Sequence, residues 1–245
     1  YEILIGLVGS EMCIRDRITI EGVKARLITS LDEMDEVIKH GVVPVIVDPK
    51  GESIAKLRPD IVVDAIIAKK NLGTFMDMAP LVIGVGPGFT AGEDVDIVVE
   101  TMRGHNLARI IDKGQALVNT GIPGNIGGYT SERVIHAEAY GFIKNICHIG
   151  DVVKKGDEIA RIYEKYDNNT SESGFQGEYV PVNATISGII RGLIRDGFEV
   201  TEGFKIADID PREGELKNCF TISDKSRSIG GSVLEAVCSY VSGIN

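Results

Sequence analysis

Two stretches of the chain, HAEAYGFIKNICHIGDVVKKGDEIARIY at 136–163 and NATISGIIRGLIRDGFEVTEGFKIADID at 183–210, share one pattern. Aligned without gaps at an offset of 47 residues, they are identical at nine of 28 positions, where unrelated segments would share about two. Both have the form G-x-I, six residues, then G-x-x-V-x-x-G-x-x-I-A-x-I. Short apolar runs alternate with glycines, which indicates strands and turns. Each copy can bury its apolar face only against the other.

This doubled pattern resembles the two-fold barrel-sandwich hybrid of biotinyl and lipoyl domains. In those carriers a lysine stands at the hairpin tip between the halves. Here the connection at 164–182 is long and polar, and its single lysine, Lys165, lacks that context. We therefore expect 136–212 to be a structural or docking barrel and not a carrier domain, with a flexible insertion at 164–182.

The preceding part of the chain has the pattern of an α/β unit. Its predicted elements are a helix LDEMDEVIKH (31–40) capped by Ser30, a buried strand VVPVIVD (42–48), a short helix ESIAKL (52–57) and a strand DIVVDAII (60–67). Strands and helices that alternate over short connections are typical of parallel pairing. We interpret 18–80 as a Rossmann-like remnant.

We expect this remnant to lack its beginning. Residues 1–17, YEILIGLVGSEMCIRDR, back-translate into a sequence that resembles a transposon-type sequencing adapter. We interpret them as a translated artefact and exclude them from fold reasoning. The native message is then expected to start near Ile18, with the beginning of the Rossmann-like domain missing.

Residues 81–135 are predicted to be a glycine-rich β connecting region. The segment LVIGVGPGFTAGED (81–94) is a strand that runs into a loop, and VDIVVETM with LARII across RGHN indicates a hairpin. Glycines in such a loop let backbone N–H groups cradle an oxyanion, although they also serve plain turn geometry. The same two interpretations apply to NTGIPGNIGGYTSERV (119–134). The loop glycines are Gly84, Gly86, Gly88 and Gly92.

The last segment, 213–245, is predicted to contain a short strand and an amphipathic helix. Between them SDKSRSIGG (223–231) places Lys225 and Arg227 just before the expected helix start. Cations beside backbone donors at a helix N-terminus favour an anion site. The alternative is a solvated, capped turn.

Composition narrows the class of protein. The chain is 43% hydrophobic with a formal net charge of −10, which supports packed cores and argues against nucleic acid as the main partner. We expect no membrane segment, because no apolar run approaches the length of a spanning helix. The four cysteines form no C-x-x-C pair, so we expect a reducing cytoplasm and neither a disulfide framework nor a metal site.

Several long segments together resemble one family, the accessory (maturation) proteins of the selenium-dependent molybdenum hydroxylase system. These segments are VIVDPKGESI, LRPDIVVDAIIAKKNLGT, DMAPLVIGVGPGFTAGEDVD, VVETMRGHNLARII, NTGIPGNIGGYTSERV and CFTISDKSRSIGGSVLEAV. The resemblance runs from about Ile18 to Val237. It implies a maturation role, a molybdenum hydroxylase or its maturation machinery as partner, and a nucleotide or molybdopterin-type cofactor as ligand.

Three functions follow as hypotheses. The first is a cofactor-binding maturation factor, and its candidate ligand-binding residues are Gly84, Gly86, Gly88, Gly92, Glu100, Arg103, His105, Asn106, Lys225 and Arg227. Arginine and backbone amides suit phosphate and molybdate-like oxyanions. The second is a non-catalytic scaffold whose barrel docks a partner enzyme.

The third hypothesis is a transferase acting on a cofactor precursor. Its candidate acid or base is Asp77, Glu100 or His105, with Lys69 or Lys70 as an electrostatic clamp. The sequence contains no catalytic signature, so it leaves open whether the protein is an enzyme, and it gives no indication of the oligomeric state. Cys147 is expected to be a structural thiol, since its neighbours in NICHIG are apolar.

Overall fold

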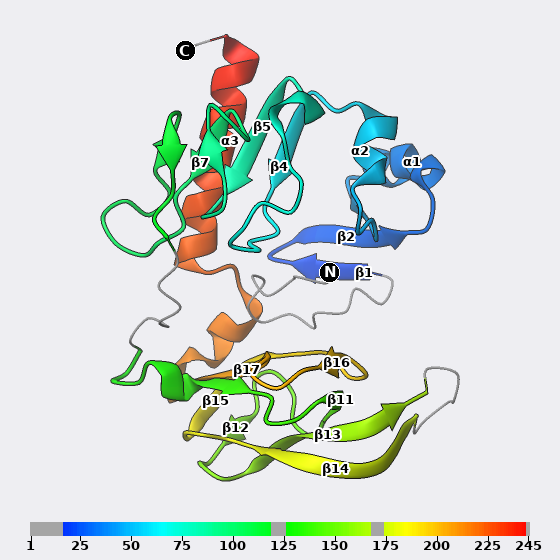
Figure 1. Ribbon diagram of the computed structural model, residues 1–245, viewed down its shortest axis with the longest axis vertical. Helices are drawn as coiled ribbons and strands as arrows, with labels where there is room; N and C mark the ends of the chain where they lie inside the picture. Colours follow the sequence, from blue (N-terminus) through cyan, green and yellow to red (C-terminus); the bar gives the residue numbers. More distant parts are fainter. Residues whose placement is uncertain (1–16, 119–125, 168–173, 244–245) are drawn as a thin grey trace. The chain divides into compact units, whose positions relative to one another are not determined.

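The chain folds into two compact units. The computed structural model describes residues 17–118, 126–167 and 174–243 (Figure 1). The first unit is built from 23–118 and 222–243, and the second from residues between them together with the first few described residues. The chain therefore leaves the first unit, builds the second and returns. The predicted order is confirmed: a mixed α/β part, then antiparallel sheets, then a long C-terminal helix. Residues 1–16 of the expected artefact lie outside the described residues.

The first unit opens with the predicted strand–helix–strand. After β1 (Arg17–Ile20), β2 (Val23–Ile28) pairs in parallel with β3 (Val43–Ile46) across η1 (Leu31–Glu33) and α1 (Met34–Lys39). Ser30 begins the helical segment as predicted, in a capping box with Glu33. The short helix α2 (Glu52–Leu57) follows. The strand at 42–48 was expected to be buried, but Val43 is 48% exposed, and β3 is an edge strand of the sheet β1-β2-β3.

A second sheet carries most of the core of this unit. Its order is β4 (Ile61–Asp64), β5 (Leu81–Val85), β7 (Ile97–Val99), β8 (Ile110–Ile111), and the first three strands are parallel. The predicted hairpin is confirmed by the antiparallel pairing of Val98 with Ile111. The connecting elements are η2 (Met76–Met78), β6 (Thr90–Ala91) and β9 (Gly114–Gln115).

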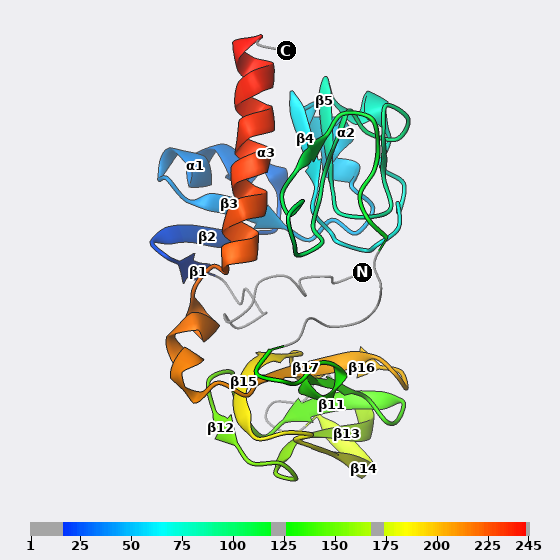
Figure 2. The same cartoon turned by 90° about the vertical axis from the view of Figure 1, so that its left-hand side faces the viewer.

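Helix α3 (Asp224–Ser242) covers one face of this sheet (Figures 1 and 2). Ile83 and Val99 of the strands pack against Ala236 and Val233 of the helix. On the opposite face, buried residues of the strands pack against the loops between them, and this cluster contains Val62, Val82, Phe89, Ala91, Val95, Val98 and Ala116. Both faces of the parallel strands are therefore apolar, as expected for a sheet between two layers.

The C-terminal segment differs from its prediction in two ways. The strand expected near 218 is replaced by η4 (Glu213–Phe220), whose Cys219 is buried. The helix starts earlier than expected, at Asp224, because the Ser223 hydroxyl caps it by accepting from Ser226 N at 3.1 Å. Gly230 and Gly231 consequently lie within α3 and do not precede it.

The second unit consists of two four-stranded antiparallel sheets. Their orders are β10-β17-β15-β12 and β14-β13-β11-β16. A short helix η3 (Ser131–Arg133) precedes the strands, which are β10 (Val134–His136), β11 (Gly141–Asn145), β12 (Val152–Val153), β13 (Glu158–Tyr166), β14 (Phe175–Asn183), β15 (Gly188–Leu193), β16 (Glu199–Val200) and β17 (Lys205–Asp210). The two copies of the repeat exchange strands, since β11, β12 and β13 correspond to β15, β16 and β17 at the offset of 47.

Reciprocal backbone hydrogen bonds join the two copies. Bonds from the first copy to the second have equivalents in the opposite direction. Two of these pairs are Gly156 N–Ala184 O with Gly203 N–Ala137 O, and Gly150 N–Ile190 O with Gly197 N–Ile143 O, all at 2.8 Å. A Cβ on either Gly141 or Gly188 would collide with a backbone carbonyl oxygen of the neighbouring strand. The repeated glycines therefore permit the close strand approach, and the predicted repeat is present in the structure.

The connection at 164–182 is more ordered than expected. The described parts of it belong to β13 and β14, which pair antiparallel from Glu158 to Tyr166. Phe175 contacts Tyr166 and Tyr163 with ring centroids 4.5 and 5.4 Å away. Tyrosine and phenylalanine have high strand propensity, and cross-strand aromatic pairs stabilise the hairpin. The two ends of 164–182 are therefore paired strands, while residues 168–173 of the expected insertion lie outside the described part.

Candidate functional site

The candidate site of the first unit lies at one edge of its parallel strands. β4 ends at Asp64, β5 at Val85 and β7 at Val99. Parallel strands bring their carboxyl ends to the same edge, where open α/β sheets bind their ligands. The segments that follow these ends are 65–70, 86–88 and 100–103.

The loop after β5 depends on two glycines. Gly86 has φ +90°, and its N–H donates to Val99 O at 2.9 Å, which extends the pairing of β5 with β7. Gly88 has φ +113°, and a Cβ there would lie 2.6 Å from the Cα of Lys70. Only glycine fits both the backbone conformation and this close approach. The loops after β4 and β5 therefore touch at Gly88.

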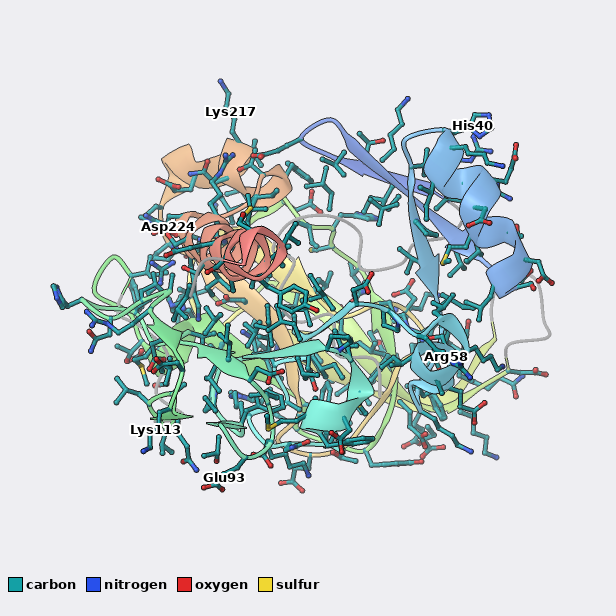
Figure 3. All side chains as sticks on the ribbon, turned by 90° about the horizontal axis from the view of Figure 1, so that it is seen from above. His40, Arg58, Glu93, Lys113, Lys217 and Asp224 are labelled. Carbon is teal, nitrogen blue, oxygen red and sulfur yellow. The ribbon has the colours of Figure 1, made fainter. Side chains whose placement is uncertain are left out.

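The other two glycines of the predicted loop have different roles. Gly84 lies within β5, where a Cβ would meet the ring of Phe89 at 2.6 Å. Gly92 lies in the turn after β6, and its N–H donates to Val95 O at 2.8 Å. Its neighbour Glu93 lies well away from Asp224 (Figure 3). The structure thus places Gly86 and Gly88 at the sheet edge and Gly92 elsewhere.

Glu100, the first residue after β7, is buried with 2% of its surface exposed. One carboxylate oxygen, Oε1, accepts from Met102 N at 2.7 Å, and the other, Oε2, accepts from Leu117 N at 2.8 Å. Buried carboxylates need such partners. Glu100 therefore holds the loop after β7 against the segment at 117.

Three cationic side chains come together beside this carboxylate. Arg103 makes a bidentate ion pair with Asp224, with both N–O distances 2.9 Å, and this pairing raises the pKa of Arg103. Lys225, in the first turn of α3, is partly buried. Burial is the largest cause that lowers the pKa of Lys225. The charges of Arg103 and Lys69 lower this pKa further, and the charge of Glu100 raises it. We call Lys69, Arg103 and Lys225 the cation cluster.

The Lys225 ammonium group has no acceptor within the described residues. No hydrogen bond or ion pair involves it there. The carboxylates of Asp224 and Glu100 are occupied, since Asp224 is bound by Arg103 and Glu100 by backbone N–H groups. Figure 3 shows Asp224 at the start of α3. The cluster thus carries more positive charge than its neighbours balance.

The remaining predicted residues lie at several different positions. His105 and Asn106 are exposed in the turn between β7 and β8, where Asn106 O accepts from Arg109 N at 3.0 Å. Arg227 is exposed on α3, and its Nε donates to Ile222 O at 3.4 Å. Asp77 lies in η2, before β5 begins, and so at the opposite end of the strands from Glu100. The structure does not bring the proposed transferase groups Asp77 and Glu100 together.

Sequence reasoning missed two residues at this edge. Asp64 is buried and fixes the loop after β4, because its carboxylate accepts from Ile66 N at 3.1 Å and from Thr74 Oγ1 at 2.6 Å. Asp224 is the partner of Arg103. A polar residue directly after an apolar strand was the available signal for Asp64. No local signal identifies Asp224.

Other kinds of site find little support among the described residues. No group of three His, Cys, Asp or Glu side chains in that part of the chain is placed to hold a metal ion. No helix within it is long and apolar enough to cross a membrane. Of the described cysteines, Cys219 is buried, Cys147 is partly buried and Cys238 is exposed. Burial raises the pKa of the Cys147 thiol, as expected for a structural role.

The chain is thus a mixed α/β protein with a cation cluster at the carboxyl ends of its parallel strands. The chain is homologous to "Uncharacterized protein YqeB" of Escherichia coli strain K12, with 49% identity over 219 residues, 89% of this chain and 38% of that protein. It therefore spans less than two fifths of that protein's length. No protein-family model matches the chain.

Among solved structures the similarity is distant. An aspartoacylase family protein from Mesorhizobium loti is 14% identical and has a TM-score of 0.27, with 34% of this chain and 24% of that chain covered. A succinylglutamate desuccinylase from Silicibacter sp. is 16% identical with a TM-score of 0.25, with 54% and 45% covered. Similarity at this level carries no conclusion about activity.

Proposed function

We propose that this chain is part of an accessory protein that matures a selenium-dependent molybdenum hydroxylase in the cytoplasm. In this role its first unit binds an anionic group, the phosphate of a nucleotide or of a molybdopterin-type cofactor, or an oxyanion such as molybdate. The observation that carries the binding proposal is the partly buried Lys225 ammonium group without an acceptor, beside Lys69 and Arg103. The hydroxylase or its maturation machinery is the partner.

Electrostatics favour an anion at this position. Like charges that gather in a partly buried place repel one another, and an oxyanion relieves that repulsion. Arg103, whose fork is bound by Asp224, adds to this attraction through its positive charge. Lys225 also lies in the first turn of the 19-residue helix α3, and the positive end of a helix dipole attracts negative charge. Such a cluster in a chain with a net charge of −10 favours a dedicated anion site over general basicity.

The two units have separate roles in this proposal. The first is a Rossmann-like domain that holds the anionic group at the carboxyl edge of β4, β5 and β7. The second is a barrel-sandwich module that docks the partner enzyme. Its exchange of equivalent strands between two sheets supports that fold. Its long hairpin of β13 and β14 offers a docking surface, where the ring of exposed Tyr179 contacts that of Tyr163 in a tilted arrangement with centroids 5.2 Å apart.

Thermal unfolding in the presence of ligand tests the anion site. A ligand that binds only the folded state raises the melting temperature with its concentration. The ligands to compare are inorganic phosphate, molybdate and ADP. We expect at least one of them to raise the melting temperature of the unaltered chain and none to raise that of Lys225→Gln. Lys113→Gln, an exposed lysine far from Asp224 (Figure 3), is the matched control and keeps the effect. No stabilisation of the unaltered chain, or the same stabilisation of Lys225→Gln, rejects the site.

The maturation role needs a cellular measurement. In cells that make a selenium-dependent molybdenum hydroxylase, Lys225→Gln in the full-length protein is expected to lower the activity of the isolated hydroxylase and its molybdenum content. Lys113→Gln leaves both unchanged. Full hydroxylase activity without any functional copy of the accessory protein refutes the role.

A further inference from the structure

The outer edge of β4 has no neighbouring strand among the described residues. β4 is the end strand of its sheet (Figure 1) and pairs there only with β5. Asp60 O accepts from Leu81 N at 3.2 Å, so the N–H and C=O groups of Ile61 and Val63, which alternate with those of Asp60, point away from β5. Neither residue carries the charge or proline that commonly protects an edge, and such an edge is a template for another strand.

One face of β4 is uncovered as well. Val63 pairs with Ile83 of β5 and therefore lies on the same face of the sheet. Ile83 is buried in one cluster with Ala236 of α3, whereas Val63 is 39% exposed. Helix α3 thus covers β5 and leaves the end of β4 bare. In parallel sheets both faces are normally covered by the helices that connect the strands.

The loop after β4 adds two exposed apolar side chains. Ile66 and Ile67 are 42% and 37% exposed, and Ile67 has φ +58°, which a β-branched residue rarely adopts. The buried Asp64 fixes this loop, because its carboxylate accepts from Ile66 N at 3.1 Å and from Thr74 Oγ1 at 2.6 Å. A strained conformation persists only where its surroundings determine it, so the exposure belongs to a fixed backbone. We call Val63, Ile66 and Ile67 the β4 surface.

We propose that a strand and its connecting helix, from the part of the full-length protein outside these 245 residues, cover the β4 surface. The strand lies alongside β4, and the helix lies beside α3. The length of the Escherichia coli relative allows such a unit, because the matched part is 38% of that protein. Parallel strands are joined by crossovers of about a dozen residues or more, usually a helix, so one strand–helix unit completes both the bare edge and the uncovered face. The inference goes beyond the anion site and does not depend on it.

A lysine at position 63 tests this cover. In the 245-residue chain the side chain at 63 is partly exposed, so Val63→Lys is expected to lower the melting temperature by less than about 2 °C. In the full-length protein the same lysine is buried without a partner, and we expect a fall of about 4 °C or more. Val152→Lys, at a 65% exposed position of the second unit, is the matched control and changes the melting temperature by less than about 2 °C at both lengths.

Amide hydrogen exchange tests the strand pairing. The N–H groups of Ile61 and Val63 are expected to exchange about 100-fold more slowly in the full-length protein than in the 245-residue chain, because the added strand supplies acceptors for them. The N–H group of Leu81, which already donates to Asp60 O, is the internal reference and is expected to slow by less than about tenfold.

The outcomes decide between occupants of the β4 surface. Equal effects of Val63→Lys at both lengths, or equal exchange of Ile61 and Val63, overturn the proposal. Unfolding of Val63→Lys in the full-length protein alone supports it, since the lysine is then tolerated only where nothing covers it. Light scattering tests a second copy as occupant: the 245-residue chain is expected to be monomeric, and a dimer that Val63→Lys dissociates assigns the β4 surface to self-association and overturns the proposal.

Discussion

Replacing Glu100 by glutamine tests whether a buried carboxylate organises the edge of the sheet. Glutamine has nearly the same shape as glutamate, but one carboxylate oxygen becomes an NH2 group. In the folded chain both oxygens accept from backbone N–H groups, of Met102 at 2.7 Å and of Leu117 at 2.8 Å. Whichever way the amide turns, one of these N–H groups then faces another donor.

The expected cost follows from those two bonds. A hydrogen bond to a charged group contributes about 1.5–3 kcal/mol, and a buried donor left without an acceptor costs about 1–3 kcal/mol. Because the two effects overlap at one N–H group, we expect Glu100→Gln to lower the free energy of unfolding of the first unit by about 3 kcal/mol. Glu93→Gln, at an exposed position, is expected to change it by less than about 0.5 kcal/mol.

Urea unfolding followed by circular dichroism measures the loss, since the chain has no tryptophan. Amide hydrogen exchange locates it, because the N–H groups of Met102 and Leu117 should exchange faster in Glu100→Gln while the strands of the second unit are unchanged. If Glu100→Gln unfolds within 0.5 kcal/mol of the unaltered chain, taking about that value as the limit of a surface substitution, the two hydrogen bonds do not carry the assigned role.

Three further predictions concern stability and binding. Gly88→Ala places a Cβ 2.6 Å from the backbone of Lys70 at φ +113°, so it should lower the free energy of unfolding in urea by about 3 kcal/mol. Gly92→Ala is the control, because the space around its Cβ is open, and it should lower this free energy by about 1 kcal/mol. Equal losses in the two variants would contradict the close approach at Gly88. Desolvation of Asp210 by itself raises its pKa, but ion pairs with arginines outweigh this effect and hold the pKa below 3.8 in the folded chain. The ion pairs therefore stabilise the fold above pH 3.8, and this stabilisation is lost as the pH falls through the pKa of Asp210 in the folded chain. Acid titration should therefore show a flatter decline for Asp210→Asn than for the unaltered chain, and identical slopes would refute the pairing. Asp224→Asn frees the fork of Arg103, so calorimetry should find phosphate bound about two- to fivefold more tightly, since an exposed ion pair contributes up to about 1 kcal/mol; weaker binding would exclude Arg103 as a ligand.

The sequence predicted those parts of the fold that local pattern controls. The repeat was evident because Gly141 and Gly188 stand where no Cβ fits, and an identity at such a place reflects a steric need. Ser30 predicted the start of its helix correctly because a capping box depends only on residues close in sequence. The strand expected near 218 failed because burial of Cys219 in η4, a tertiary effect, outweighed strand propensity.

The site was predictable only in pieces. Glu100, Arg103 and Lys225 were chosen for their chemistry, but Arg103 and Asp224 are 121 positions apart. Their pairing follows from the packing of α3 on the sheet, which no local spacing encodes. The role of Glu100 as an internal anchor could not be inferred either, because a carboxylate looks the same in sequence whether it accepts from backbone or from a ligand.

The return of the chain to its first unit sets an order of events during synthesis. As the polypeptide leaves the ribosome, every strand from β10 to β17 has emerged before α3 exists. Until then the face of the sheet with Ile83 and Val99 has no helix to cover it. The cation cluster also contains only Lys69 and Arg103 at that stage, because Lys225 has not yet been added. A ribosome that stalls before residue 224 releases a chain with the strands β10 to β17 and without a complete cation cluster, so only molecules translated beyond Lys225 carry the proposed anion site.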